Sequence, residues 1–170
     1  MITAGIDMGS KTVKVVILID GKIVSKSKVL TGFDQAKSAE NAYAEALKKA
    51  GKTRADVSKV IATGAGRKEV PFSNGDITMV AADAKGVAKL FPNAKTIIDI
   101  GAEEGRAIKT DGKGKVLDFA VNEKCAAGAG AFVEAMARAM QVSLDEFASF
   151  SLQSTKSIPI NAQCAIFAES

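Results

Sequence analysis

The sequence contains no histidine and no tryptophan, only 2 cysteines, and few aromatic residues, which make up 5% of its 170 residues. Without an imidazole, every catalytic scheme and every metal site that depends on histidine is excluded. The basic residues are scattered, and aromatics are too scarce to interleave with them, so a nucleic-acid partner is not expected. A net charge of +4 and a pI near 9.0 give only a weak hint of an anionic ligand.

Long apolar runs are also missing. No stretch approaches the roughly 18 residues of a membrane span, and residues 1–6 lack the basic region and apolar run of a signal peptide. We therefore expect a cytoplasmic protein with no membrane partner. A disulfide between Cys125 and Cys164 is not expected in that reducing compartment, which leaves buried thiols, catalysis or metal binding as their roles.

One order of landmarks occurs twice, at a spacing of 92 residues from Asp7 to Asp99. In each copy a short apolar strand ends in Asp-x-Gly, and a second strand, an Asp-Gly turn and a third strand follow. We interpret this order as an internal structural duplication. The predicted strands are 2–6, 12–19 and 22–29 in the first copy, and 96–100, 106–110 and 115–121 in the second.

Helical patterns alternate with these strands. Apolar residues at i, i+3 and i+4 spacing predict one buried helical face in residues 35–50, which Gly51 ends. The alternation predicts an α/β fold, with a first lobe at 1–93 and a second lobe at 94–170. Further helices are expected at 79–90, 131–140 and 144–150, and a strand at 59–63 enters the glycine turn 64–66.

The two Asp-x-Gly turns suggest phosphate and metal chemistry. Glycine lets a phosphate approach the backbone, and a carboxylate at the end of a buried strand can hold Mg²⁺ or its waters. Duplicated lobes that face each other would place Asp7 and Asp99 on opposite walls of one cleft. The alternative is that each Asp-x-Gly is simply a tight turn, since aspartate and glycine are common there.

These segments resemble a known family. Asp7-Met8-Gly9-Ser10-Lys11-Thr12 and Asp99-Ile100-Gly101 resemble the phosphate motifs of the ATPase superfamily that contains actin, the heat-shock chaperones and the sugar kinases. Residues 122–132 and 164–170, which carry the cysteines, closely resemble the iron-sulfur ATPases that activate 2-hydroxyacyl-CoA dehydratases and serve as ATP-binding subunits of benzoyl-CoA reductase. The resemblance runs through the whole chain. It implies duplicated ribonuclease H-like lobes, the second incomplete, because family members continue into a glycine-rich adenosine-binding segment.

The resemblance also implies a function. ATP hydrolysis would drive low-potential electrons from a ferredoxin-like donor into a dehydratase or reductase component. Asp7 and Asp99 would lie near Mg²⁺ and the attacking water, and Glu103 or Glu104 either orients that water or is a solvated loop charge. The residues expected to hold ATP or ADP are Gly9, Ser10, Lys11, Thr12, Gly101, Ala102, Glu103, Gly128 and Gly130.

Two cysteines would supply half of the ligands of one cluster. A 4Fe-4S cluster requires about four thiolates, so the other ligands would come from a second molecule, most simply across the two-fold axis of a dimer. The resemblance implies a cluster that Cys125 and Cys164 share between identical or related subunits. The alternatives are that each cysteine is a buried small hydrophobe or half of a four-thiolate zinc site. A small-molecule kinase and a non-catalytic dimerising module are the competing functions.

Overall fold

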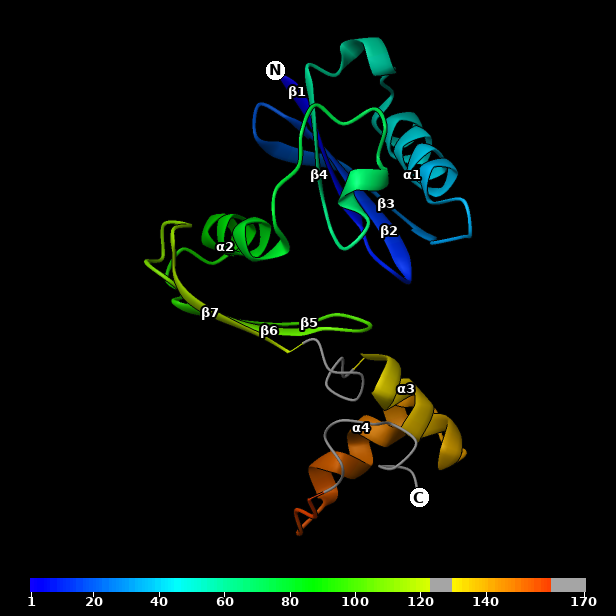
Figure 1. Cartoon of the computed structure of the whole chain (residues 1–170), viewed down its shortest axis with the longest axis vertical. Coiled ribbons are helices and arrows are strands. Elements are labelled where there is room, and N and C mark those ends of the chain that lie inside the picture. Colours follow the sequence, from blue (N-terminus) through cyan, green and yellow to red (C-terminus); the bar gives the residue numbers. More distant parts are fainter. Residues whose placement is uncertain (123–129, 160–170) are drawn as a thin grey trace. The chain divides into compact units, whose positions relative to one another are not determined.

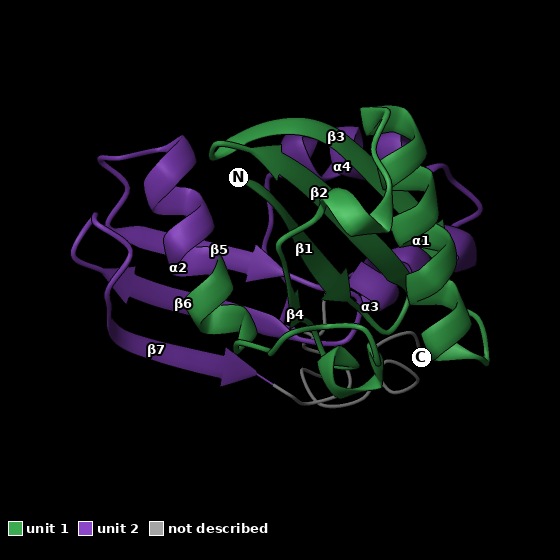
Figure 2. Ribbon diagram, turned by 90° about the horizontal axis from the view of Figure 1, so that it is seen from above, with its two compact units in different colours: residues 1–82 green, residues 83–170 purple. Residues whose placement is uncertain are grey.

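The computed structural model describes residues 1–122 and 130–159. Cys125, Gly128 and Cys164 lie outside the described residues. The chain divides into two compact units, Met1–Ala82 and Asp83–Ser170, which are coloured separately in Figure 2. Each unit contains its own β-sheet and is described in turn.

The first unit is built on a four-stranded sheet of order β3-β2-β1-β4. The β1–β2 and β2–β3 pairs are antiparallel, and β4 is parallel to β1. The carboxyl ends of β1 and β4 therefore lie at the same edge of the sheet. The strands are β1 (Ile2–Met8), β2 (Thr12–Ile19), β3 (Lys22–Leu30) and β4 (Lys59–Thr63).

Helix α1 (Gln35–Ala50) covers one face of this sheet (Figure 1). Asp34 caps its start by accepting a hydrogen bond from the Lys37 backbone N–H, and Gly51 ends it in the left-handed conformation. Half of the buried residues on the face that meets the sheet are alanines, which lets the helix approach the sheet closely. Its buried residues are Ser38, Ala39, Ala42, Tyr43, Ala46 and Leu47.

The second unit contains a three-stranded antiparallel sheet of order β5-β6-β7. Helix α2 begins in the last residues of the first unit and continues into the second. The elements are α2 (Met79–Leu90), β5 (Thr96–Ile100), β6 (Gly105–Thr110), β7 (Val116–Asn122), α3 (Gly130–Ala139) and α4 (Leu144–Gln153). Two short 3₁₀ helices, η1 (Arg54–Asp56) and η2 (Arg67–Glu69), belong to the first unit.

The two sheets repeat one another, as the duplicated landmarks predicted. Strands β1 to β3 and β5 to β7 have the same order and the same antiparallel pairing. The central strand of each sheet carries an irregularity, at Ile17/Leu18 in β2 and at Lys109/Thr110 in β6, again 92 residues apart. A register irregularity at the same place in both copies belongs to the repeated backbone, because the side chains at the two positions differ.

All predicted strands and helices are confirmed, with differences at their ends. Strand β1 continues to Met8, two residues beyond its predicted end, because Asp7 and Met8 still pair with β2. The two units divide within α2, ahead of the turn at Pro92. Among the described residues, no helix combines the length and apolar character that a membrane crossing requires.

Candidate functional site

The first Asp-x-Gly segment places a carboxylate opposite a lysine. In the β1–β2 register Asp7 lies directly across from Lys14, and the Lys14 Nζ donates to the Asp7 Oδ2 at 2.7 Å. The neighbouring β1 side chains, Ile6 and Met8, are buried in the core beneath α1. Because successive side chains in a strand alternate, Asp7 lies on the opposite face, where its side chain remains 35% exposed.

The turn that follows Asp7 is closed by backbone hydrogen bonds. The Gly9 N–H donates to the Thr12 carbonyl at 3.2 Å. Thr31, just after β3, anchors the turn twice: its N–H donates to the Lys11 carbonyl at 3.0 Å, and its hydroxyl donates to the Gly9 carbonyl at 2.8 Å. A Cβ on Gly9 would lie 2.8 Å from the Thr12 oxygen, so the turn requires glycine here.

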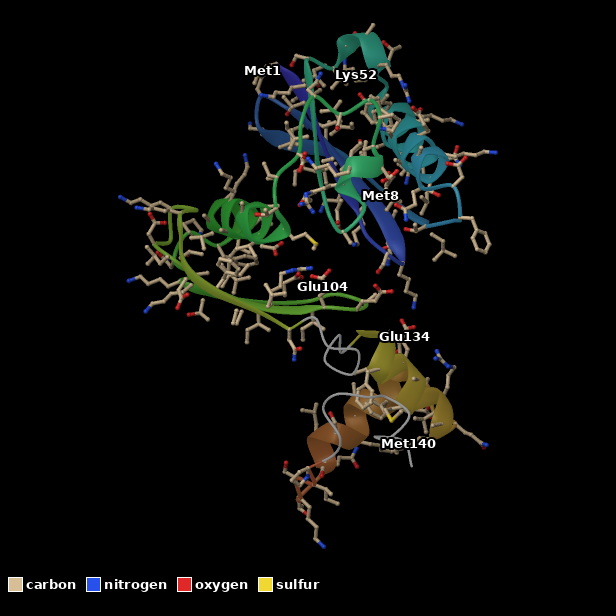
Figure 3. The ribbon with its side chains drawn as sticks, in the orientation of Figure 1. Met1, Met8, Lys52, Glu104, Glu134 and Met140 are labelled. Atoms are coloured by element: carbon tan, nitrogen blue, oxygen red, sulfur yellow. The ribbon has the colours of Figure 1, made fainter. Side chains whose placement is uncertain are left out.

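The second Asp-x-Gly segment repeats this arrangement. Asp99 lies across from Arg106 in the β5–β6 register, and the two form an ion pair. Arg106 also donates to Glu104, labelled in Figure 3, at 2.9 Å. The Gly101 N–H donates to the Glu104 carbonyl at 2.8 Å, which closes the turn as Gly9 does. Glu104 is thus an ion-pair partner in this structure, whereas Glu103 is exposed.

The structure brings three of the predicted site residues together in the second unit. At the start of α3, the Gly130 N–H donates to the Gly101 carbonyl at 3.3 Å and the Ala131 N–H donates to the Ala102 carbonyl at 3.0 Å. A Cβ on Gly130 would lie 2.7 Å from the Gly101 oxygen. Glycine at position 130 therefore lets the helix start against the second turn. That the turns of the two units face one cleft stays a prediction.

A pocket of about 680 Å³ opens beside the first turn. Gly9 and Ser10 form one wall, the first residues of α1 form another, and the segment after β4 forms a third. The lining residues are Gly9, Ser10, Phe33, Asp34, Gln35, Ala36, Ala65, Gly66, Lys68 and Glu69. Only Gly9 and Ser10 were predicted to belong to a site.

The segment after β4 carries a small charged cluster. Asp76 accepts hydrogen bonds from Lys68 at 2.6 Å and from Arg67 at 2.9 Å. The Lys68 hydrogen bond, more than that of Arg67, holds the pKa of Asp76 below its usual value. Asp76 also pairs with Ala62 of β4 in an isolated parallel β-bridge. These contacts therefore hold the turn after β4 against that strand.

Sequence reasoning missed the cations that face the two aspartates. Lys14 and Arg106 each follow their aspartate by seven residues, across a hairpin of the same length. The repeated order of landmarks contains this signal, since the same spacing places a basic residue opposite the carboxylate in both copies. The Thr31 anchor has no comparable sequence signal, because its role depends on where β3 ends.

The chain is similar along its whole length to several known proteins. A model of the BadF/BadG/BcrA/BcrD ATPase family matches residues 4–170. The activator of lactoyl-CoA dehydratase from Anaerotignum propionicum is 41% identical over 170 residues, which cover 100% of this chain and 66% of that protein. A benzoyl-CoA reductase subunit from Thauera aromatica is 36% identical over 173 residues, which cover 99% of this chain and 61% of that protein.

Two known structures share the fold closely. Component A of the (R)-2-hydroxyglutaryl-CoA dehydratase from Acidaminococcus fermentans superposes with a TM-score of 0.88 at 34% identity, covering 99% of this chain and 65% of the other. The activator of the 2-hydroxyisocaproyl-CoA dehydratase from Clostridium difficile with bound ADPNP gives 0.85 at 35% identity, covering 99% and 63%. The chain spans just under two thirds of the length of these relatives.

Proposed function

The chain belongs to the BadF/BadG/BcrA/BcrD ATPase family, and we propose from this premise that it hydrolyses ATP to drive low-potential electrons into an acyl-CoA dehydratase or reductase partner. The observation that carries the proposal is the repeated turn: in both units a carboxylate beside a cation precedes a glycine turn closed in the same way. Relatives named as dehydratase activators and as part of a benzoyl-CoA reductase support the choice of partner.

The nucleotide phosphates would lie against the two turns. A relative of the same fold holds ADPNP, and hydrolysis by positioning and charge stabilisation suits a site made of backbone and cations. In our proposal Ser10, Lys11 and Thr12 surround the phosphates, and Gly9 keeps the first turn tight. The second turn would contribute Gly101, Ala102 and Glu103, together with Gly128 and Gly130.

The Asp7 and Asp99 carboxylates are suited to bind Mg²⁺. Asp7 and Asp99 supply hard oxygen ligands, and their side chains are 35% and 36% exposed, so both remain within reach of a hydrated ion. Lys14 is half-exposed and can leave Asp7 when a metal competes for it, whereas the Arg106 side chain, 6% exposed, keeps Asp99 in place. When bound, Mg²⁺ would neutralise charge on the phosphates and help order the attacking water.

The ATPase proposal can be tested by neutralising Asp7. We expect Asp7→Asn to lower kcat for Mg-ATP hydrolysis by about a hundredfold, in the range typical of lost acid–base or water-orienting groups. Asp20→Asn is the matched control. Asp20 lies in the turn between β2 and β3, is exposed, and has a positive φ that asparagine tolerates. Equal activity in Asp7→Asn and the unmodified protein would contradict the proposal. Transfer of the phosphate to an added polyol or carboxylate would instead favour a small-molecule kinase.

We further propose that Cys125 and Cys164 ligate a 4Fe-4S cluster shared by two subunits. The donor set fits, because two thiols per chain and no histidine leave a four-thiolate site to be completed by a second copy or a related chain. A ferredoxin-like protein would donate the electron. ATP-driven closure can reach the cluster only if ATP binds the closed form more tightly than the open one.

Anaerobic reconstitution tests the cluster. We expect about four irons per two chains after addition of iron and sulfide, and loss of the iron in both Cys125→Ser and Cys164→Ser. The protein should also be dimeric by sedimentation when loaded. Uptake of zinc in preference to iron, or iron binding that survives both substitutions, would overturn this part while leaving the ATPase proposal intact.

A further inference from the structure

Strand β4 ends in a second glycine-rich turn, Thr63–Lys68, to which the proposed function assigns no role. Because β4 is parallel to β1, this turn leaves the sheet at the same edge as the turn after Asp7. In the β1–β4 register Thr63 pairs directly with Asp7. Paired residues on adjacent strands, about 4.8 Å apart, point to the same face, so the side chains of Thr63 and Asp7 are neighbours.

The backbone of this turn fills the space beside the Asp7 carboxylate. Gly64 is buried and has a φ of +97°. A Cβ there would lie 2.7 Å from the Asp7 Oδ1 and would also collide with the Met8 carbonyl. The Gly66 N–H donates to that same carbonyl at 2.9 Å, at the end of β1 where Met8 is labelled in Figure 3. The turn after β4 therefore limits where the Asp7 carboxylate can lie.

Thr63 adds a polar group without a partner. Its Oγ1 is buried and makes no hydrogen bond in the part of the chain that the structure describes. A buried hydroxyl without a partner weakens a fold. Threonine at this position is therefore better explained by a partner that arrives with a ligand than by packing.

The pocket beside the turn after Asp7 is an independent link between that turn and the turn after β4. Its wall passes from Gly9 and Ser10 to Ala65, Gly66 and Lys68 without leaving the first unit. A ligand in this pocket would contact both the turn after Asp7 and residues 65–68 of the turn after β4, next to Asp7, Thr63 and Gly64, which do not themselves line the pocket.

We propose that Thr63 and Gly64 are positioning residues for Asp7: Gly64 limits the position of the carboxylate, and the Thr63 hydroxyl hydrogen-bonds the water that Asp7 orders when nucleotide is bound. The inference rests on the proposed ATPase function. It adds β4 and its turn to a nucleotide site whose predicted residues lie in the two Asp-x-Gly segments and at Gly128 and Gly130.

Thr63→Val tests the hydroxyl, because valine keeps the shape and removes the polar group. We expect kcat for ATP hydrolysis in the whole protein to fall about tenfold, the effect of one hydrogen bond, with KM for ATP within about twofold, since an ordered water is used in the transition state. The urea midpoint should stay or rise, because the lost hydroxyl had no partner. Thr63→Ser should restore most of kcat.

Thr110→Val is the matched control. Thr110 is a buried threonine whose hydroxyl does have partners: it donates to the Ala94 carbonyl at 3.3 Å and accepts from the Gly112 N–H at 3.1 Å. We expect this variant to lower the urea midpoint and to leave kcat per folded molecule unchanged, the reverse of Thr63→Val.

Gly64→Ala tests the backbone contact, with Gly51→Ala as its control. Both glycines have positive φ, but a Cβ on Gly51 meets nothing within 4 Å. Both substitutions should lower the urea midpoint through backbone strain, whereas only Gly64→Ala should weaken binding of a fluorescent Mg-ATP analogue, by about tenfold or more.

The outcomes separate this inference from the function on which it rests. If the unmodified protein does not hydrolyse ATP, the proposed function fails and the inference fails with it. If the unmodified protein is active and Thr63→Val retains its kcat, or loses stability as Thr110→Val does, the inference alone is overturned.

Discussion

The two aspartates of the repeat face cations in different surroundings. Lys14, opposite Asp7, has a side chain that is 50% exposed, whereas the Arg106 side chain, opposite Asp99, is 6% exposed and contacts two carboxylates. An exposed pair contributes little to stability. A buried guanidinium that bridges two acids is held by a geometry that lysine cannot reproduce.

Conservative exchanges of these two cations should therefore change the free energy of unfolding by different amounts. We expect Arg106→Lys to lower the free energy of unfolding by about 1–2 kcal/mol, because one charge-assisted hydrogen bond is lost. Lys14→Arg should change it by less than about 0.5 kcal/mol. Urea unfolding at neutral pH measures both, and equal effects would show that burial does not distinguish the two pairs.

Asp76 makes the free energy of unfolding depend on pH. Hydrogen bonds from Lys68 first, and from Arg67, lower its pKa in the fold from an ordinary value of 3.8. The unfolded chain then binds the proton more readily, so the stability from this group is complete above about pH 5 and is lost as pH falls through 3.8 and below. Asp76→Asn should flatten the fall of the urea midpoint between pH 5 and 3. Lys68→Met, which keeps the carboxylate but removes its first donor, should flatten it in part. An unchanged pH profile in Asp76→Asn would contradict this assignment.

At the scale of elements, α1 depends on small residues. Ala42 is 0% exposed against the sheet, and its carbonyl also accepts a hydrogen bond from the Ser27 hydroxyl of β3 at 2.6 Å. Because protein interiors are closely packed, we expect little room for a larger side chain at position 42.

Enlarging one alanine of α1 should thus depend on the face that it occupies. We expect Ala42→Leu to lower the free energy of unfolding by about 1–3 kcal/mol through overpacking. Ala44→Leu, two residues away on the exposed face, should change it by less than about 0.5 kcal/mol. Thermal or urea unfolding of the two variants measures the difference. Similar losses of stability in both would mean that α1 does not pack against the sheet with Ala42 buried and Ala44 exposed.

Periodicity and turn residues predicted these elements well because each depends on local physics. The 3.6-residue pattern of α1 and the Asp20–Gly21 hairpin needed no tertiary information. The role of Thr63 could not be predicted in this way. Its partner in the register, Asp7, is 56 residues away in the sequence, and the two meet only because β4 returns parallel to β1.

At the scale of the molecule, the duplication was visible in landmarks but not in burial. Ile6 in β1 is 1% exposed beneath α1, whereas Ile98, at the corresponding position in β5, is 74% exposed. Both are isoleucines in the same strand pattern, so the sequence gives no sign of which face is covered. For the cysteines the sequence goes further than the structure. Their motifs predict a cluster by resemblance, whereas Cys125 and Cys164 lie outside the described parts of the chain.

Because the buried core lies in the first unit, we expect that unit to fold without the second. The main hydrophobic core, from Ala4 to Val70 with Phe72 packed against it, lies wholly within the first unit. The last segment before α2 is tied to β4, since the Ile77 N–H donates to the Ala62 carbonyl at 2.9 Å. Residues 1–78 thus contain a complete sheet, its covering helix and all of their mutual hydrogen bonds.

We expect a fragment of residues 1–78 to fold alone, with a cooperative urea transition and a free energy of unfolding of about 3–5 kcal/mol, typical of a small single core. Ile17→Ala in the fragment is the control. Ile17 is 0% exposed, and its truncation should cost about 2–5 kcal/mol, which removes a large part of the fragment's expected stability and lowers its urea midpoint. Circular dichroism and hydrogen exchange would measure both. A broad, non-cooperative transition that Ile17→Ala does not change would show that the first unit needs the second, because a native core responds to the loss of one buried side chain whereas a collapsed chain does not.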